Sequence, residues 1–241
     1  MELHVYQTPD EVIGGLADFF VETINQSIAA NGECNLVLSG GNSPKKLYQL
    51  LAGDSYKNKV DWKKVWFFFG DERYVPFTDA NNNGLMAKQS LFDPLGIDES
   101  KIFYINTALK PEDSAADYAK KITAHFGNNP IQFDLILLGL GDNSHTASLF
   151  PNTKVLYEMK ALVSAPFIEE LNAYRITMTA PLINESHNIA FLVYGEVKAE
   201  AVHHILKDEK NIDAYPAQLI EPEDGELHWF MDEAAAVKVK E

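Results

Sequence analysis

Short apolar blocks alternate with longer segments of helical periodicity along most of the chain. Several blocks are continuously apolar, which is typical of strands covered on both faces, as in parallel or mixed α/β sheets. The predicted strands span residues 35–39, 65–69, 102–105, 133–138, 161–164, 174–179 and 189–194.

The segments between these blocks carry apolar residues at helical spacing. The predicted helices span residues 10–32, 44–53, 83–94, 111–127 and 196–207. Alternation of this kind favours an α/β layered fold, in which helices flank a mostly parallel central sheet, over a barrel or a sandwich. Because we find no internal repeat, low-complexity tract or linker, we expect residues 1–241 to form a single domain.

Composition narrows the classes of partner. The net charge is −15, from 20 Lys and Arg against 35 Asp and Glu. An acidic surface repels phosphate backbones and anionic lipids, so nucleic acid and membranes are not expected as partners. The negative electrostatic potential of the protein also opposes the approach of an anionic small substrate. A binding site for such a substrate would therefore need cations of its own.

The single cysteine, Cys34, cannot form an intrachain disulfide, which fits a reducing compartment. It lies just before an apolar run, and we expect it to be buried and to have no chemical role. The first residues do not form a secretory leader, and no apolar run approaches the length of a membrane span. These features predict a soluble cytoplasmic protein.

The first candidate site is the glycine turn Ser39-Gly40-Gly41, between a predicted strand and a predicted helix. Adjacent glycines allow close approach of a ligand to the backbone, and the following helix offers free N–H groups to an anion. Asn42 belongs to this loop, Ser43 is the expected N-cap, and Pro44 is expected at the first helical position. The spacing fits neither the dinucleotide fingerprint nor the Walker loop, which argues against a nicotinamide-dependent dehydrogenase. A tight turn without a ligand remains the alternative.

The second candidate follows the apolar strand that ends at Gly70, where Asp71, Glu72 and Arg73 come in succession. Ligand crevices of open α/β sheets lie beyond the carboxyl ends of the strands, so these residues would stand at the rim. Arg73 can clamp a phosphate or carbonyl oxygen. The alternative is a solvated loop with an internal ion pair. The polar run that follows, up to Asn83, predicts a turn.

The third candidate is the stretch LGLGDNSHTASLFP at 138–151, which places His145 after another strand and glycine turn. An ordinary histidine pKa near 6.5 would let His145 accept a proton from water at neutral pH. The alternative is a polar residue that only follows a turn. No nucleophile elbow surrounds Ser144, and no second ligand stands at metal-binding spacing from His145, so no metal is predicted.

Two further cations lie near strand ends: Arg175 at the start of a predicted strand, and Lys198 shortly after another. A cation near a strand end is often only a solvent-exposed surface residue. In a protein with this large negative net charge, however, the position of a cation is a stronger indication of an anion-binding site. His203 and His204 are adjacent within a predicted helix and point in different directions, so we expect them to be structural or exposed to solvent.

The combined pattern resembles the 6-phosphogluconolactonases of the glucosamine-6-phosphate isomerase/deaminase superfamily. The motifs occur in order over nearly the whole chain: SGGNSP, GDERYVPFTDANNN, GLGDNSHTASLFP, RITMTAPLIN, FLVYGEVKAEAV, YPAQL and HWFMDEAAA. The resemblance implies a NagB-like α/β fold and a cytoplasmic enzyme of the oxidative pentose phosphate pathway. It also implies hydrolysis of 6-phospho-D-glucono-1,5-lactone to 6-phosphogluconate without a metal or an organic cofactor.

The resemblance also assigns roles to residues. It implies that the Ser39-Gly40-Gly41 loop binds the substrate phosphate with help from Arg175 and Lys198. It implies that Arg73 contacts the substrate and that His145 is the general base that activates water.

The chain departs from the family pattern next to His145, because the family more often has Asp-Gly-His where this chain has Asn143-Ser144-His145. The aspartate's role could pass to Asp142 or to another carboxylate, or the reaction could need only an oriented imidazole; we favour the last. Two other functions stay open: a glucosamine-6-phosphate deaminase, and a catalytically silent sugar-phosphate-binding protein. The sequence is compatible with a monomer or a homodimer.

Overall fold

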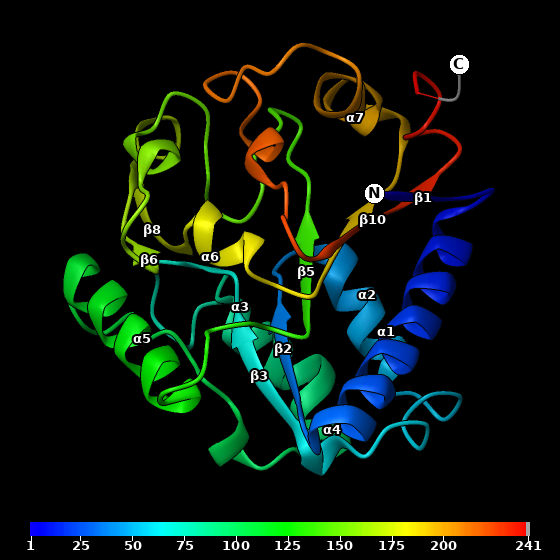
Figure 1. The fold of residues 1–241 in the computed structure, drawn as a ribbon, viewed down its shortest axis with the longest axis vertical. Helices are drawn as coiled ribbons and strands as arrows, with labels where there is room; N and C mark the ends of the chain where they lie inside the picture. Colours follow the sequence, from blue (N-terminus) through cyan, green and yellow to red (C-terminus); the bar gives the residue numbers. More distant parts are fainter. Residues whose placement is uncertain (240–241) are drawn as a thin grey trace.

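The computed structural model describes residues 1–239 and is built around a six-stranded sheet in which every neighbouring pair of strands is parallel (Figure 1). The strand order is β1-β10-β9-β5-β2-β3. The strands are β1 (Glu2–Tyr6), β10 (Glu226–Asp232), β9 (Asn188–Val193), β5 (Leu135–Gly139), β2 (Cys34–Leu38) and β3 (Val65–Phe69).

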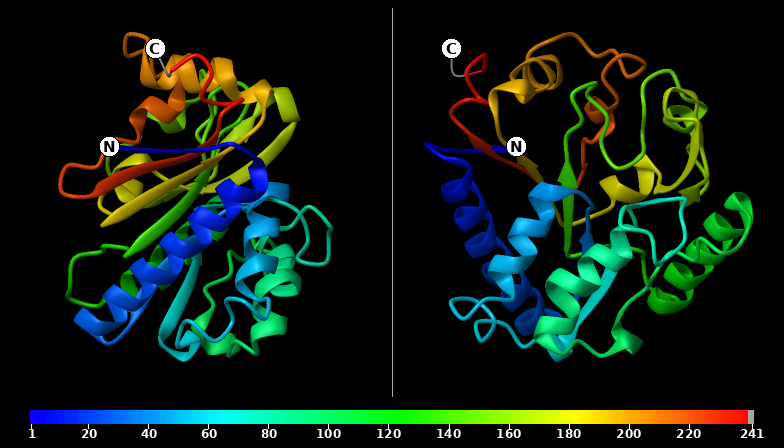
Figure 2. Two further views of the ribbon diagram at one scale, coloured as in Figure 1. Left: turned by 90° about the vertical axis from the view of Figure 1, so that its right-hand side faces the viewer. Right: turned by 180° about the vertical axis from the view of Figure 1, so that it is seen from behind.

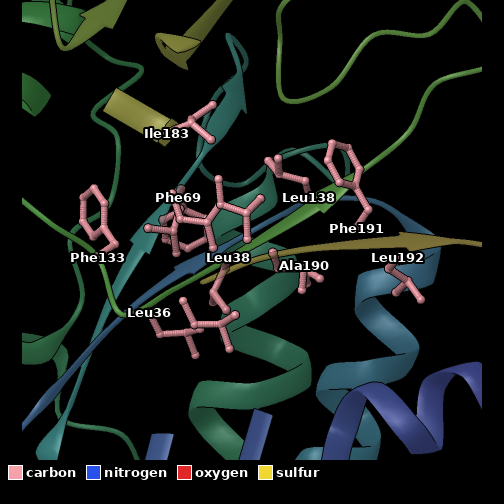
Figure 3. Packing of buried hydrophobic residues seen from close by; sticks show 14 of the residues in the cluster. Leu36, Leu38, Phe69, Phe133, Leu138, Ile183, Ala190, Phe191 and Leu192 are labelled. Carbon is pink, nitrogen blue, oxygen red and sulfur yellow. The ribbon is translucent and has the colours of Figure 1, made fainter. Parts of the chain in front are cut away.

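The central strands are apolar on both faces because both faces are covered. Leu36 and Leu38 of β2 and Leu138 of β5 are buried, as are Phe69 of β3 and Phe191 of β9, and they belong to one continuous core (Figure 3). Cys34 is buried at the start of β2, as expected. The mostly parallel central sheet predicted from the sequence is therefore confirmed.

Helices flank this sheet. The longest, α1 (Pro9–Asn31), begins with a capping box between Thr8 and Glu11 and packs across the sheet against β10, β9, β5 and β2 (Figure 2). Six further α-helices occur within residues 1–239. They are α2 (Asn42–Leu51), α3 (Asn83–Ala87), α4 (Asp93–Leu95), α5 (Pro111–Phe126), α6 (Ala180–Asn184) and α7 (Ala199–Leu206).

A smaller antiparallel sheet lies beside the central one. It has the order β4-β8-β6, and β7 pairs separately with β8. Its strands are β4 (Asp71–Arg73), β8 (Ala173–Met178), β6 (Val163–Ser164) and β7 (Phe167–Ile168). Helix α5 packs against β6 and β8. The charged triplet after Gly70 is thus an ordered strand, and the solvated-loop alternative is wrong.

Three sequence predictions need correction. Residues 102–105 do not form a strand, because only Ile102 makes a bridge to Phe67 of β3. The helix predicted over 83–94 is divided by a π-helical segment at Lys88–Phe92. The helix predicted from residue 196 begins at Ala199, after a 3₁₀ turn at Glu196–Lys198.

Strands β1 and β10 were not predicted, because polar residues interrupt their apolar pattern. Residues of β1 are largely exposed at the edge of the sheet, so burial leaves little signal in the sequence. Among residues 1–239, no helix is both long and apolar enough to cross a membrane.

Candidate active site at the carboxyl ends of the strands

The loops that leave β2, β5 and β9 meet at the same edge of the sheet, because these strands are parallel neighbours. Together with β4 and β8 they enclose a cavity of about 290 Å³. The residues that line it are Ser39, Gly40, Gly41, Asp71, Arg73, Gly139, Leu140, Gly141, His145, Thr146, Ala147, Ser148, Phe150, Arg175 and Lys198. The cavity thus brings together the glycine turn, the candidate base and the three candidate cations from separate parts of the sequence.

The Ser39 end of the glycine turn is held from behind by the buried hydroxyl of Tyr48 in α2. This hydroxyl donates to the Ser39 carbonyl at 2.7 Å and accepts from the Ser39 N–H at 3.0 Å. Burial raises the pKa of Tyr48 strongly. The phenol therefore stays protonated, and its oxygen can donate one hydrogen bond and accept the other. Tyr48 therefore fixes the backbone of the turn without entering the cavity.

Both glycines of the turn are required by local geometry. A Cβ on Gly40 would lie 1.9 Å from Oδ1 of Asn83, and Gly41 has a φ of 104°, which favours glycine. Helix α2 begins at Asn42 with Gly41 as its N-cap, so the expectations that Ser43 is the N-cap and Pro44 the first helical residue are both wrong. No side chain caps this helix within the described chain, which leaves its first N–H groups available. Asn42 and Ser43 do not line the cavity.

The two arginines stand directly opposite each other, Arg73 on β4 and Arg175 on β8. They are the only arginines in the sequence. Like charges opposite each other on antiparallel strands destabilise the pair, and neither guanidinium has an ion-pair partner within residues 1–239. Burial lowers the pKa of Arg175; the charge of Asp71 raises it, and the charge of Arg73 lowers it by a smaller amount. An anion between the two side chains would relieve this repulsion.

The supporting residues on β4 have mainly structural contacts. Asp71 accepts a hydrogen bond from the Ser148 hydroxyl at 2.6 Å, and its carbonyl accepts one from the Asn83 amide at 3.0 Å. The Glu72 carboxylate accepts from the backbone N–H groups of Arg73, Asn83 and Gly84. Burial raises the pKa of Glu72 to about 7, against the lowering effect of these donors. Glu72 and Asn83 fix the start of α3 and do not line the cavity.

Lys198 lies at the cavity with its ammonium group 2.5 Å from Oδ1 of Asp142. Asp142 is largely exposed, whereas Lys198 is mostly buried. Because Asp142 contacts the lysine, it is not the residue that orients His145. The lysine is held at the site by a carboxylate that solvent can reach.

The imidazole of His145 lies flat on Phe150, with ring centroids 4.0 Å apart and an angle of 15° between the planes. Gly141 gives it room, because a Cβ there would lie 2.0 Å from Nδ1 of the ring. Burial lowers the pKa of His145 to about 4. The ring is therefore neutral at pH 7, with one nitrogen able to accept a proton.

Asn143 and Glu170 determine which nitrogen that is. The Nδ1 atom of His145 lies 2.5 Å from Oδ1 of Asn143, and Nδ2 of Asn143 donates to Oε1 of Glu170 at 3.1 Å. A carboxylate only accepts, so Asn143 must turn its NH₂ toward Glu170 and its oxygen toward His145. That oxygen also only accepts, so Nδ1 carries the proton and the lone pair is on Nε2. No hydrogen bond to Nε2 occurs within residues 1–239.

The backbone of the 142–145 turn keeps a glycine-like conformation although the glycine of the family pattern is replaced. Ser144 has a φ of 62°, in the left-handed region that non-glycine residues rarely adopt. Its N–H donates to the Gly141 carbonyl, and its carbonyl accepts from Ala217. These contacts hold Ser144 in this strained conformation.

Sequence reasoning missed several residues that complete this site: Tyr48, Ser148, Phe150 and Glu170. Phe150 stands five residues after His145, and its aromatic ring was the one local signal available. Glu170 is 27 residues from Asn143, and only the folded chain brings the two together.

The fold and the cavity define a class: an α/β protein with a glycine turn at a helix N-terminus, two facing arginines and a histidine of lowered pKa at one edge of its sheet. The family model described as glucosamine-6-phosphate isomerases/6-phosphogluconolactonase matches residues 7–229. The chain belongs to this family.

Two curated relatives and one solved structure give the degree of similarity. A 6-phosphogluconolactonase of Synechocystis sp. is 39% identical over 222 residues, which cover 90% of this chain and 89% of the relative. A 6-phosphogluconolactonase of Nostoc sp. is 34% identical over 245 residues, covering 99% of each. The structure of 6-phosphogluconolactonase from Trypanosoma cruzi is 28% identical, covers 99% of this chain and 97% of that one, and has a TM-score of 0.89. The expected NagB-like layered fold is confirmed.

Proposed function

We propose that this chain is a 6-phosphogluconolactonase, which hydrolyses 6-phospho-D-glucono-1,5-lactone to 6-phosphogluconate. The observation that carries the proposal is the meeting of the Ser39-Gly40-Gly41 turn, two arginines without ion-pair partners among residues 1–239, and His145 in one cavity. The names of the relatives support the same reaction. The chain acts as one domain, as a monomer or homodimer in the cytoplasm, and its net charge of −15 argues against a nucleic-acid or membrane partner.

The phosphate of the substrate binds at the Ser39-Gly40-Gly41 turn, where the N-terminus of α2 and the side chains of Arg175 and Lys198 supply positive charge. Arg73 contacts the lactone, on the same face of the small sheet as Arg175. Anchoring at the phosphate places the C1 carbonyl next to His145 and so lowers the entropic part of the barrier.

The reaction uses His145 as a general base and needs neither a metal nor an organic cofactor. Nε2 takes a proton from water as the water oxygen bonds to C1, and negative charge develops on the carbonyl oxygen. Arg73 or backbone N–H groups stabilise that oxyanion. The C1–O5 bond then breaks, and the proton on Nε2 passes to O5, which gives the open-chain acid.

A rate assay with freshly generated 6-phosphogluconolactone, corrected for spontaneous hydrolysis, tests the proposal. The chain is expected to accelerate hydrolysis and to release no ammonia from glucosamine 6-phosphate. Ammonia release would instead identify a deaminase. Tight binding of 6-phosphogluconate without acceleration would identify a silent sugar-phosphate-binding protein.

The lowered pKa of His145 gives a prediction about its charge. Because the pKa is about 4, His145 in the free protein stays neutral as the pH falls from about 8 to about 5.5, where an ordinary histidine becomes protonated. Proton NMR of the ring is the measurement, with the resonance assigned by its loss in His145→Gln. A titration midpoint near 6.5 for this resonance would contradict a partly buried base that is neutral at pH 7.

The same shift affects the stability of the fold. Between about 4 and about 6.5 the unfolded chain holds a proton on this histidine and the folded chain does not, so this contribution to stability is present above that range and is lost as the pH falls.

The contact between Glu170 and Asn143 gives a second prediction. Glu170→Ala is expected to lower kcat by about two- to tenfold, the value of one ordinary hydrogen bond, with little change in KM. Asn143 would then be free to turn, and the imidazole would lose its fixed tautomer. Steady-state kinetics on the variant measure the effect.

Two variants control this experiment. Glu170→Gln keeps an oxygen that can accept from Asn143 and is expected to restore most of kcat. Glu169→Ala removes the adjacent exposed carboxylate, which does not contact Asn143, and is expected to leave kcat unchanged. Equal effects of Glu170→Ala and Glu169→Ala would mean that charge, not orientation, is responsible.

A further inference from the structure

A second cluster of chemically active side chains lies at the β1 edge of the central sheet. Strands β1 and β10 are parallel, and Glu2 stands opposite His228. Side chains alternate along a strand, so Glu2 and His4 project from the same face of β1. None of the three residues lines the active-site cavity. His4 and His228 are 224 residues apart, so no spacing in the sequence could reveal this group.

One atom from each side chain converges on a common point. Nε2 of His4 lies 3.2 Å from Nδ1 of His228. Oε2 of Glu2 lies 3.7 Å from the first of these atoms and 3.5 Å from the second. Tetrahedral zinc holds nitrogen and oxygen ligands at about 2.0–2.2 Å, which places neighbouring ligands roughly 3.3–3.5 Å apart. The three atoms therefore match one face of a zinc coordination tetrahedron.

The surroundings fix both imidazoles. The ring of His4 stacks on Phe230 at 4.3 Å between centroids, and the buried ring of His228 packs against Phe19 at 4.6 Å. Nε2 of His228 lies 3.3 Å from Oε2 of Glu226. This buried nitrogen has no hydrogen-bond partner among residues 1–239, so a proton on it would face the Glu226 carboxylate. That arrangement recurs at histidine ligands of zinc and would leave Nδ1 with a free lone pair. Nδ1 is the atom that faces His4 and Glu2.

We propose that Glu2, His4 and His228 form a binding site for one divalent transition-metal ion, for which zinc is the best fit. Two imidazoles and one carboxylate suit zinc, whereas calcium and magnesium prefer oxygen ligands throughout. The Glu2 side chain is 65% exposed, so the fourth position opens to solvent and can take water. The ion would join the edge strand β1 to β10, because two ligands come from one strand and the third from the other.

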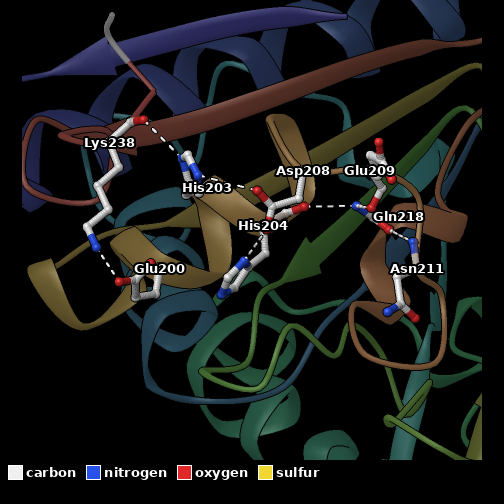
Figure 4. Close-up of polar contacts among 8 residues, drawn as sticks. All are labelled: Glu200, His203, His204, Asp208, Glu209, Asn211, Gln218 and Lys238. Atoms are coloured by element: carbon white, nitrogen blue, oxygen red, sulfur yellow. Dashed lines mark hydrogen bonds and ion pairs between the residues drawn. The ribbon is translucent and has the colours of Figure 1, made fainter.

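The histidine pair of α7 provides a contrast. His204 contacts one oxygen of Asp208 at 2.5 Å and His203 lies 3.4 Å from the other, while Nδ1 of His203 lies 3.2 Å from the Lys238 carbonyl (Figure 4). These rings flank the carboxylate and do not converge on one point. Within residues 1–239, the group of Glu2, His4 and His228 alone has convergent metal-ligand atoms. His204 is therefore the matched control.

The test is isothermal titration of the full chain, without a histidine tag and after treatment with EDTA, with zinc chloride. The expected result is saturable binding of one ion per chain, weakened at least tenfold in both His4→Gln and Glu2→Gln and unchanged in His204→Gln. The two test side chains are partly or largely exposed, so folding should survive, and circular dichroism checks this. Cobalt at the same site should give the strong visible absorption of a four-coordinate ion.

Two outcomes would overturn the proposal. One is the lack of saturable zinc binding to the native chain, which would leave the two imidazoles as a simple hydrogen-bonded pair. The other is one-to-one binding that persists in His4→Gln and Glu2→Gln, which would place the ion elsewhere. Neither outcome bears on lactone hydrolysis, because the group lies outside the active-site cavity.

Discussion

Replacing His145 with alanine is expected to lower kcat for 6-phosphogluconolactone by about a hundredfold or more, which is typical for the loss of a general base. KM should change little, because the residues proposed to bind the phosphate lie on the glycine turn and on other strands. The reason for the large effect is that Nε2 is the one atom of the histidine left free to take a proton from water. Initial rates corrected for spontaneous hydrolysis give the measurement.

Two further variants separate chemistry from packing in this experiment. His145→Gln keeps a polar side chain that can still contact Asn143 but cannot accept the proton, and it should be as slow as the alanine variant. His204→Ala removes a histidine on α7 that does not line the cavity and should leave the rate unchanged. Turnover close to normal in His145→Gln would disprove the assignment of the base.

The second large effect is expected from Arg175→Met, which should raise KM for the phosphorylated lactone by about ten- to a hundredfold. That range corresponds to the loss of a hydrogen bond to a charged group, about 1.5–3 kcal/mol. Methionine fills much of the same half-buried space without a charge, so the fold should be preserved. The variant should be assayed in parallel with unphosphorylated glucono-1,5-lactone, for which no loss is expected.

The comparison of the two lactones identifies the role of the arginine. If both lose activity equally, Arg175 does not bind the phosphate and acts on the ring or on the fold. Arg175→Lys supplies the matched control, because it keeps the charge but loses the planar fork that binds two phosphate oxygens. We expect an intermediate KM for the lysine variant.

The sequence predicted the parts of the fold that depend on local pattern. The continuously apolar segments of β2, β3, β5 and β9 could be found because both faces of these strands are buried. Edge strand β1 could not be found, because its exposed residues carry little pattern. Strand β4 could not be found either, because its three charged or polar residues become a strand only by pairing with β8.

The residues of the candidate site likewise include some that the sequence pattern reveals and others that it does not. Glycines and charged residues that follow strand ends are visible in the sequence, and Ser39, Arg73, His145 and Lys198 were found from that signal. What supports them was not visible, because it depends on contacts between distant segments. Glu170 reaches the site through Asn143, and the Tyr48 hydroxyl reaches Ser39 from the buried side of α2.

The facing arginines have a consequence for how the protein responds to its environment. Arg73 and Arg175 bring two like charges to one register position of β4 and β8, and a phosphate ester bound between them would attract both strands. Occupancy of the site and cohesion of the small sheet are thus thermodynamically linked. A higher concentration of such an ester would therefore favour the paired strands through mass action.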